Sequence, residues 1–355
     1  MQIKLPEWVR RLLNFDIDGS RDRNRSRKER VDLEGMSDLS KTIFNGYQKR
    51  RTKEQKDRFI ELLKNKKINV IVEESNKAPK SRNLVVGDVS NAKIILAAHY
   101  DTPTKMDFPR ITNPAHPLIS YALSFLAFNP LLLMTAIAIC CLTELCPFWK
   151  AIFVLLLMLL QLILALLKSR FWIPNPFNYN DNTSGVITIC ELLSALNEEQ
   201  AKAVAFVLFD NEEKNVKGSE WFVECHDKDN LKDKLLINLD CVANGSHILF
   251  SINEDVSQLH KQKIKEVFSD TQGKLGSVYG LAVDFADQIS KKANSDHKNF
   301  PNGVGIGAFC KNKLGIRYLS RIHTTNDTVF EYKNIEYLVE GIKDLIANIC
   351  KPPVE

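Results

Sequence analysis

The chain has 355 residues, of which 45% are hydrophobic and 26% are charged. This composition is typical of a folded globular protein and excludes a largely disordered chain. The net charge is only +5, and no basic cluster is interleaved with aromatic residues, so the sequence does not indicate a nucleic-acid-binding protein. The length is enough for one large α/β domain with an accessory element, or for two small domains.

The first 51 residues form an N-terminal arm in which an amphipathic stretch, residues 5–15, precedes a strongly basic segment, residues 21–30. The sequence leaves two roles open for it: a solvated extension, or attraction to an anionic membrane surface at about 1 kcal/mol per basic residue. The eight cysteines form no CxxC pair, and the N-terminus lacks the apolar core of a signal peptide. These features predict a reducing compartment for the catalytic part.

Helices and strands alternate along most of the remaining chain. The pattern predicts helices at 52–66, 184–196 and 334–350, and strands at 68–73, 84–86, 94–98, 203–209 and 235–239. The last three strands are continuous apolar runs, which is typical of strands buried on both faces. Asn182 and Thr183 are suitable N-caps for the second helix. We therefore expect an α/β fold with a mostly parallel central sheet flanked by helices.

A long hydrophobic insert interrupts this scheme. Residues 111–143 contain no Asp, Glu, Lys or Arg, and a second uncharged run covers 151–167. At about 1.5 Å per helical residue, either run could cross most of a hydrocarbon layer about 30 Å thick. We predict a transmembrane helical hairpin at 117–167, inserted between two parts of a catalytic domain, 52–116 and 168–355. A re-entrant hairpin is an alternative; a buried core hairpin is disfavoured because soluble helices keep a polar face.

The charges around the insert predict its orientation. The flanking cations are Lys105, Arg110, Lys168 and Arg170, whereas the turn between the two runs holds only Glu144 and Lys150. Positive charge collects on the cytoplasmic side of membrane proteins. Both termini and the catalytic domain should therefore lie in the cytoplasm, attached to a lipid bilayer.

Metal-ligating residue types follow the predicted strands or precede a predicted helix. They are His99, Asp101, Asp181, Glu212, Glu213, Asp240 and His323. Open α/β sheets bind ligands beyond the carboxyl ends of their strands. A two-metal hydrolytic site needs such nitrogen and oxygen ligands, a bridging carboxylate and an unligated carboxylate that accepts a proton. Each residue alone has an ordinary explanation as a cap or surface group, but together they predict a metal hydrolase.

The motifs around these residues resemble the M28 family of metallopeptidases over about residues 82–350, apart from the insert. They are AHYDT at 98–102, DNTSG at 181–185, EE at 212–213, KGS at 217–219, LD at 239–240, SDH at 295–297 and HTTNDT at 323–328. The chain departs from the family's usual glycines in the segment 178–180 and at Asn211, and it departs most in the long hydrophobic insert. The resemblance implies a fold like that of zinc-dependent exopeptidases.

The resemblance also implies a set of metal ligands. His99 and Asp240 would hold one ion, Glu213 and His323 would hold the other, and Asp181 would bridge the two. The donors favour two zinc ions, although manganese or cobalt would tolerate the same ligand set.

Four further residues take roles from the same resemblance. Glu212 would act as general base and later as general acid. Asp101 would accept a hydrogen bond from the ring nitrogen of His99 that does not face the metal. Asp296 and His297 would lie beside the site, as structural support or as substrate contacts.

The implied reaction is hydrolysis of a peptide or a related amide, with an aminopeptidase as the leading candidate. One alternative is an acyltransferase similar to glutaminyl cyclases, which have the same fold but use a single zinc. A second is a catalytically inactive, membrane-tethered interaction domain; the presence of all five ligands and Glu212 argues against it.

Overall fold

The computed structural model describes residues 33–105, 146–170, 173–226, 228–287, 295–312, 315–319 and 321–350. The described strands are β1 (Ile71–Glu74), β2 (Arg82–Val86), β3 (Ile94–His99), β4 (Val204–Phe209), β5 (Leu235–Leu239), β6 (His247–Ile252), β7 (Ala282–Asp287), β8 (Gly303–Lys311) and β9 (Arg317–Tyr318). They form one sheet in the order β1-β2-β4-β3-β5-β8-β6-β7, with β9 paired to β8.

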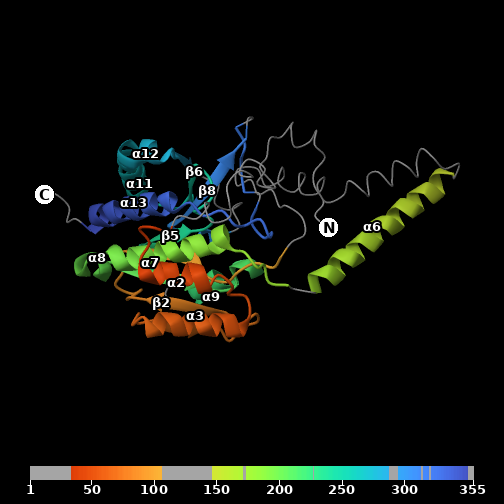
Figure 1. Cartoon of the computed structure of the whole chain (residues 1–355), viewed down its shortest axis with the longest axis horizontal. Helices are drawn as coiled ribbons and strands as arrows, with labels where there is room; N and C mark the ends of the chain where they lie inside the picture. The colour runs from red at the N-terminus through yellow and green to blue at the C-terminus, as the bar shows by residue number, and fades with distance from the viewer. Residues whose placement is uncertain are drawn as a thin grey trace.

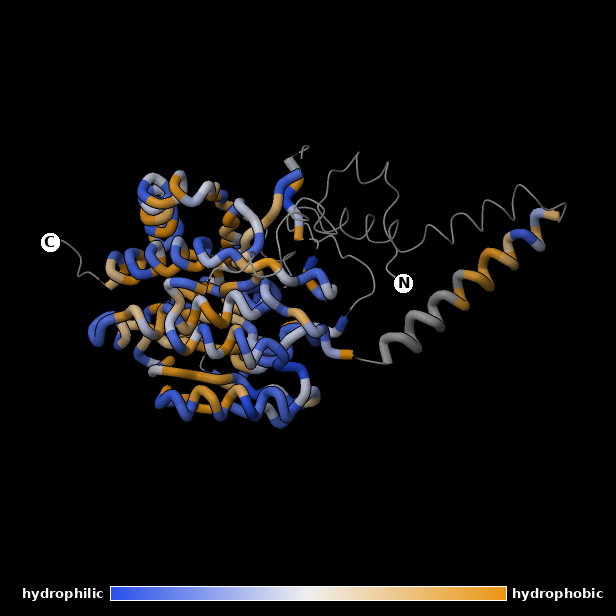
Figure 2. The backbone as a smooth tube through the Cα atoms, viewed as in Figure 1, coloured by the Kyte–Doolittle hydropathy of each residue, from blue (hydrophilic) through white to orange (hydrophobic). Residues whose placement is uncertain are grey.

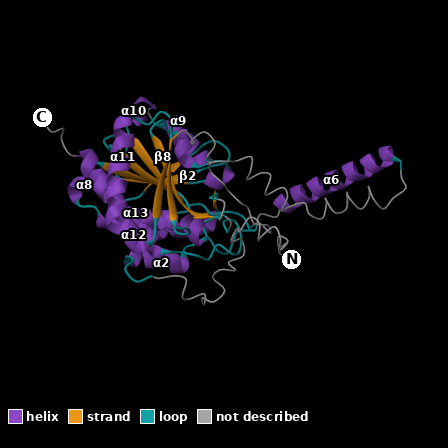
Figure 3. Ribbon diagram, turned by 90° about the horizontal axis from the view of Figure 1, so that it is seen from above, coloured by secondary structure: helices purple, strands orange, loops and turns teal. Residues whose placement is uncertain are grey.

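Helices cover both faces of this sheet (Figure 1, Figure 3). They are α2 (Asp38–Gly46), α3 (Lys53–Asn65), α7 (Gly185–Ala195), α8 (Glu198–Lys202), α9 (Lys217–Cys225), α10 (Lys228–Lys232), α11 (Gln258–Thr271), α12 (Ser277–Tyr279) and α13 (Tyr332–Cys350). One core contains buried side chains of α2, α3, α7, α11 and α13, and a smaller core on the other face contains those of α9 and α10. The architecture is therefore a sheet between two helical layers.

Strand β3 shows why the central strands are continuous apolar runs. Ile94, Leu96 and Ala98 belong to the larger core, whereas Ile95 and Ala97 belong to the smaller one. Because successive side chains of a strand point to opposite faces, a strand covered on both faces needs apolar residues throughout.

The sequence predicted the central elements well and the sheet type only in part. Strands β3, β4 and β5 and helices α3, α7 and α13 begin and end within two residues of their predicted limits, and β1 begins three residues later than predicted. The pairs β3–β4, β3–β5, β5–β8 and β6–β7 are parallel. The pairs β1–β2, β2–β4, β6–β8 and β8–β9 are antiparallel. The sheet is therefore mixed. The prediction of a mostly parallel sheet holds for the central strands β4, β3, β5 and β8, and was wrong for the antiparallel pairs β1–β2, β2–β4 and β6–β8.

The described end of the predicted N-terminal arm packs against the domain. Ser37 caps α2 and donates hydrogen bonds from its backbone and side chain to Glu191 of α7, both at 2.9 Å. Ile43 and Phe44 of α2 are buried in the larger core. Residues 36–51 thus form part of the layer that covers the sheet.

The described part of the insert is one helix, α6 (Pro147–Arg170), which Figure 1 draws apart from the sheet. It contains the second predicted apolar run, 151–167, and the coloured first part of this helix is largely hydrophobic in Figure 2. The first run, 118–143, lies outside the described residues. No helix in the described part of the chain is both long enough and apolar enough to span a membrane. The described helices therefore do not support the prediction of a transmembrane hairpin.

Candidate metal centre

The parallel centre of the sheet gathers the predicted site residues at one edge. Strand β3 pairs in parallel with both β4 and β5, so the carboxyl ends of the three strands lie side by side. His99 is the last residue of β3, Asp240 directly follows β5, and the Glu212–Glu213 pair follows β4 after two residues. A turn before α7 and a loop before α13 bring Asp181 and His323 to the same edge.

The five predicted ligands form two groups that share one residue. His99 Nε2 lies 3.4 Å from Asp181 Oδ1 and 3.6 Å from Asp240 Oδ1. His323 Nε2 lies 3.0 Å from Asp181 Oδ2 and 3.6 Å from Glu213 Oε1. In each group the ligand atoms lie within 4.8 Å of one another. Asp181 therefore presents a different oxygen to each histidine, which is the arrangement of a bridging carboxylate.

The environment of these ligands fits divalent cations. Glu213 Oε1 is buried and has no hydrogen-bond partner among the described residues. Burial disfavours the charged imidazolium of His99, yet the surrounding carboxylates raise its pKa well above the usual value. Burial likewise disfavours a charged Asp181, yet its contacts with His323 and His99 hold its pKa well below the usual value. Histidine nitrogens and carboxylate oxygens in a negative, buried setting are ligands that suit zinc.

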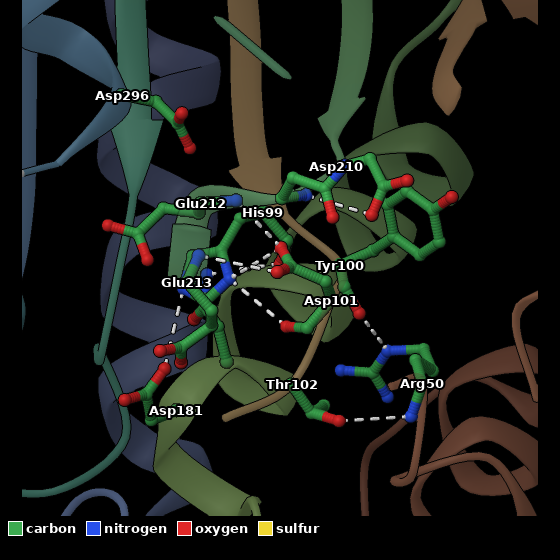
Figure 4. Close-up of polar contacts among 12 residues, drawn as sticks. Arg50, His99, Tyr100, Asp101, Thr102, Asp181, Asp210, Glu212, Glu213 and Asp296 are labelled. Carbon is green, nitrogen blue, oxygen red and sulfur yellow. Dashed lines mark hydrogen bonds and ion pairs between the residues drawn. The ribbon is translucent and has the colours of Figure 1, made fainter. Parts of the chain in front are cut away.

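Asp101 connects two of the strand ends. His99 Nδ1 lies 3.1 Å from the Asp101 carbonyl oxygen and 3.5 Å from its carboxylate, so Nε2 is left to face the ligand group. The predicted contact of Asp101 with His99 is thus present, but the closer acceptor is the carbonyl. The Asp101 carboxylate instead accepts the backbone N–H groups of Glu212, at 3.1 Å, and Glu213, at 3.3 Å (Figure 4). The sequence did not indicate this second role.

Asp327 holds the turn that carries Asp181. Its two carboxylate oxygens accept the backbone N–H groups of Asn180, at 2.9 Å, and Asp181, at 3.0 Å. Asp327 belongs to the motif that begins at His323, but the sequence assigned it no role. Since Asp327 follows His323 by four residues, it joins the loop of one ligand to the turn of the bridging residue.

Asp240 is oriented by a similar chain of hydrogen bonds. Ser295 Oγ donates to Asp240 Oδ2 at 2.7 Å and accepts from Asn238 Nδ2 at 2.8 Å. The other carboxylate oxygen of Asp240 is the one that faces His99. Ser295 therefore fixes which oxygen is free to act as a ligand.

Glu212 differs from its neighbour Glu213 in what it contacts. In the described part of the chain no hydrogen bond or ion pair involves its carboxylate, and Figure 4 shows it diverging from that of Glu213. Burial raises the pKa of Glu212 well above the usual value, and the charges of Glu213 and Asp240 add to this effect. Asn211, directly before it, has a φ of 55°, a left-handed conformation that asparagine tolerates better than most residues. A carboxylate free of ligands and with a raised pKa can accept and return a proton.

Asp296 and His297 lie beside the centre and are both buried. Ser219 Oγ of α9 donates to Asp296 Oδ1 at 2.5 Å, and burial raises the Asp296 pKa to about 7. The His297 ring packs against Gly305 of β8, where an added Cβ would lie 2.5 Å from it, and burial lowers the His297 pKa to about 4. Neither residue joins a ligand group in the described part of the chain.

Comparisons with known proteins give one family match and a set of similar solved structures. The model of peptidase family M28 matches residues 175–342, which include Asp181, Glu213, Asp240 and His323. No curated protein sequence matches the chain significantly.

Solved structures extend the comparison to most of the chain. A glutaminyl cyclase from Tannerella forsythia is 17% identical with a TM-score of 0.51, covering 87% of this chain and 96% of that one. A Zn-dependent exopeptidase from Parabacteroides distasonis is 15% identical with a TM-score of 0.51, covering 87% and 95%. BSAP, a zinc aminopeptidase from Bacillus subtilis, is 13% identical with a TM-score of 0.43, covering 78% of this chain and 51% of that one. The chain thus spans about half the length of BSAP.

At these identities the solved structures establish the fold alone. The chain has a mixed α/β fold like that of zinc exopeptidases, and nearly half of it matches the M28 peptidase family. Glutaminyl cyclase has the same fold, so the fold by itself does not choose between hydrolysis and cyclisation.

Proposed function

We propose that the chain is a two-metal hydrolase of peptide or related amide bonds, with aminopeptidase as its leading activity. The observation that carries the proposal is Asp181, whose two oxygens face His99 and His323, each accompanied by one more carboxylate. A single-metal enzyme would need only one of these groups. The match to peptidase family M28 supports peptides as the substrate class.

The described side chains account for the proton transfers. Two divalent ions bound by these ligands would supply Lewis acidity for a carbonyl and lower the pKa of water toward neutral. Glu212 accepts the proton of the attacking water and returns it to the leaving amine. The Asp101 carboxylate accepts the backbone N–H groups of Glu212 and Glu213, which fixes the position of the base and of the neighbouring ligand.

A second candidate is supported by the similarity to glutaminyl cyclase. In that case Asp181, Glu213 and His323 would bind one zinc. The α-amine of an N-terminal glutamine would attack its own side-chain amide carbonyl, and the amide nitrogen would leave as ammonia. The intact His99–Asp240 pair favours the hydrolase, because a second ion needs both residues.

Metal content measured together with activity separates the candidates. Detergent-purified full-length protein is analysed for metal and assayed on aminoacyl, N-acyl and N-glutaminyl substrates, with and without a chelator. We expect about two zinc ions per chain and amide hydrolysis that a chelator abolishes and zinc restores. One ion with N-glutaminyl cyclisation would establish the second candidate, and absence of any bound metal would refute both.

We also propose that residues 117–167 attach the chain to a lipid bilayer, with the metal centre on the cytoplasmic side. Support comes from the uncharged run at 111–143 and from large apolar side chains on the described half of α6. Phe148, Trp149, Phe153, Leu155, Leu156, Leu159 and Leu160 are each 51–67% exposed. Exposed apolar side chains gathered on one helix are typical of a surface that contacts a membrane or another protein.

A further inference from the structure

A buried arginine contacts the loops that carry His99 and Asp181 and takes no part in the proposed chemistry. Arg50 follows α2 and is fully buried. Its Nε donates to the Tyr100 carbonyl at 2.6 Å, and its Nη2 donates to Thr183 Oγ1 at 3.3 Å. Its own backbone N–H donates to Thr102 Oγ1 at 3.1 Å (Figure 4). One residue therefore contacts two loops that are far apart in the chain.

These two loops carry two of the three ligands of one metal position, His99 and Asp181. Tyr100 and Thr102 flank Asp101 and directly follow His99. Thr183 lies two residues after Asp181, in the same turn. The Arg50 guanidinium consequently joins the loop of His99 to the turn of Asp181, whose side chains lie 3.4 Å apart.

Arg50 is charged although it is buried. Its guanidinium forms no ion pair in the described part of the chain, and burial lowers its pKa to about 10, although the charge of Asp101 opposes the shift. Arg50 therefore stays charged at neutral pH. Burial of a charge costs free energy unless other groups compensate it, and here the Asp101 carboxylate supplies an opposite charge. The Phe59 ring, 5.4 Å from the guanidinium carbon, covers its other side.

We propose that Arg50 is a positioning residue that sets the spacing of His99 and Asp181, and so the affinity of the His99–Asp181–Asp240 group for its metal. A planar fork of donors can bind acceptors on both loops at once, which a lysine ammonium cannot match. Loss of the fork should chiefly release the His99 loop, because the Asp181 turn keeps its hydrogen bonds to Asp327. The inference rests on the proposed two-metal site.

Zinc binding tests this inference without reference to any substrate. Stepwise zinc affinities are measured by titration against a competing chelator for the wild type, Arg50→Lys, Arg50→Ala and Arg317→Met. Arg317 of β9 is the matched control because it is a partly buried arginine that forms no hydrogen bond or ion pair with a ligand loop in the described part of the chain. It pairs with Asp284 of the edge strand β7. We expect Arg50→Ala to weaken one of two zinc sites about 10- to 100-fold, the range found when residues that orient ligands are removed. Arg50→Lys should weaken the same site less, and Arg317→Met should bind as the wild type.

Rescue distinguishes positioning from a general loss of stability. Millimolar guanidinium should restore the weakened zinc site of Arg50→Ala, whereas equal concentrations of sodium chloride or urea should not. Wild-type affinity at both sites in a folded Arg50→Ala protein, or loss of zinc that guanidinium does not restore, would overturn the inference. A wild type that binds fewer than two zinc ions would instead refute the proposed function on which it rests.

Discussion

At the scale of single residues, adjacent groups of the same type acquire different chemistry from their surroundings. Glu213 faces His323 and belongs to a ligand group, whereas the carboxylate of Glu212 forms no hydrogen bond or ion pair in the described part of the chain. Both have raised pKa values, that of Glu213 about 7, chiefly because they are buried. A bound cation would lower the pKa of Glu213 and keep it ionised. Glu212 would then remain the proton acceptor.

Glu212→Gln should therefore impair catalysis without removing metal. The substitution preserves the shape of the side chain and removes its basic oxygen, so kcat should fall by at least about 10²-fold. Zinc content should stay near the wild-type value, whereas Glu213→Gln should lose zinc. If Glu212→Gln lost metal and Glu213→Gln kept it, the roles assigned to the two residues would be reversed.

His297 makes a pH-dependent contribution to stability. Burial lowers its pKa from 6.5 to about 4, so the unfolded chain binds more protons than the folded one between these values. Stability should therefore fall as the pH drops below about 6.5, by about 2 kcal/mol at pH 5 from this residue. His297→Gln should remove that part of the pH dependence. Urea unfolding of the wild type and the variant at pH 7.5 and pH 5, both in chelator, measures the difference; equal losses in the two proteins would contradict the assignment.

At the scale of elements, the turn before α7 depends on close contact with β5. Asn182 Nδ2 donates to the Leu239 carbonyl at 2.9 Å, and Asn182 Oδ1 accepts from Gly185 N at 3.0 Å. A Cβ at Gly185 would lie 2.3 Å from the same Leu239 oxygen. The absence of a side chain at Gly185 therefore lets the turn approach the strand end that leads to Asp240. This approach brings Asp181 and Asp240 into one ligand group.

Gly185→Ala should separate the turn from β5. Since the clash is with backbone atoms, which cannot rotate away, we expect a loss of about 1–3 kcal/mol in stability. Zinc affinity should fall with it, because Asp181 would move away from Asp240. Gly273→Ala is the control, since an added Cβ there meets nothing within 4 Å. Denaturant unfolding and zinc titration give the two readouts, and wild-type zinc affinity in Gly185→Ala would show that the close approach is not required.

At the scale of the whole molecule, hydrogen bonds join the described segments that lie before and after the insert. Lys105 N donates to the Ile173 carbonyl at 2.8 Å, and Asn175 N donates to the Pro103 carbonyl at 3.1 Å. These two hydrogen bonds connect the chain after the His99 loop to the chain before the turn of Asp181. The domain therefore joins residues 103–105 to residues 173–175 without the insert, so replacement of the insert should leave the ligand loops undisturbed.

A variant in which a short polar linker replaces residues 117–167 tests membrane attachment. The full chain should sediment with membranes through a carbonate wash, because its apolar residues prefer the hydrocarbon layer. The shortened variant should be soluble and still bind two zinc ions, since no proposed ligand lies in the replaced segment. Topology reporters at the termini should lie in the cytoplasm and one at Glu144 outside. Release of the full chain by carbonate would contradict the proposal.

The sequence by itself determined the central strands and the positions of the candidate ligands. Strands β3, β4 and β5 are buried on both faces, so continuous apolar runs identified them, and polar residues at their ends marked the edge of the sheet. The helices α7 and α13 were equally clear because each is long enough for its apolar residues to form a stripe. Local patterns of this kind carry information about an element and about the few residues directly after it.

Only the tertiary structure decided how the ligands are held in place. Arg50 and Thr183 are 133 residues apart, and Asp327 and Asp181 are 146 residues apart, so no local pattern relates them. Strand β8 was missed because it carries three glycines, which lower its strand propensity. The close packing of His297 on one of these glycines becomes visible only in the fold. Periodicity reports which face of an element is buried, whereas a hydrogen bond between distant loops depends on how the whole chain folds.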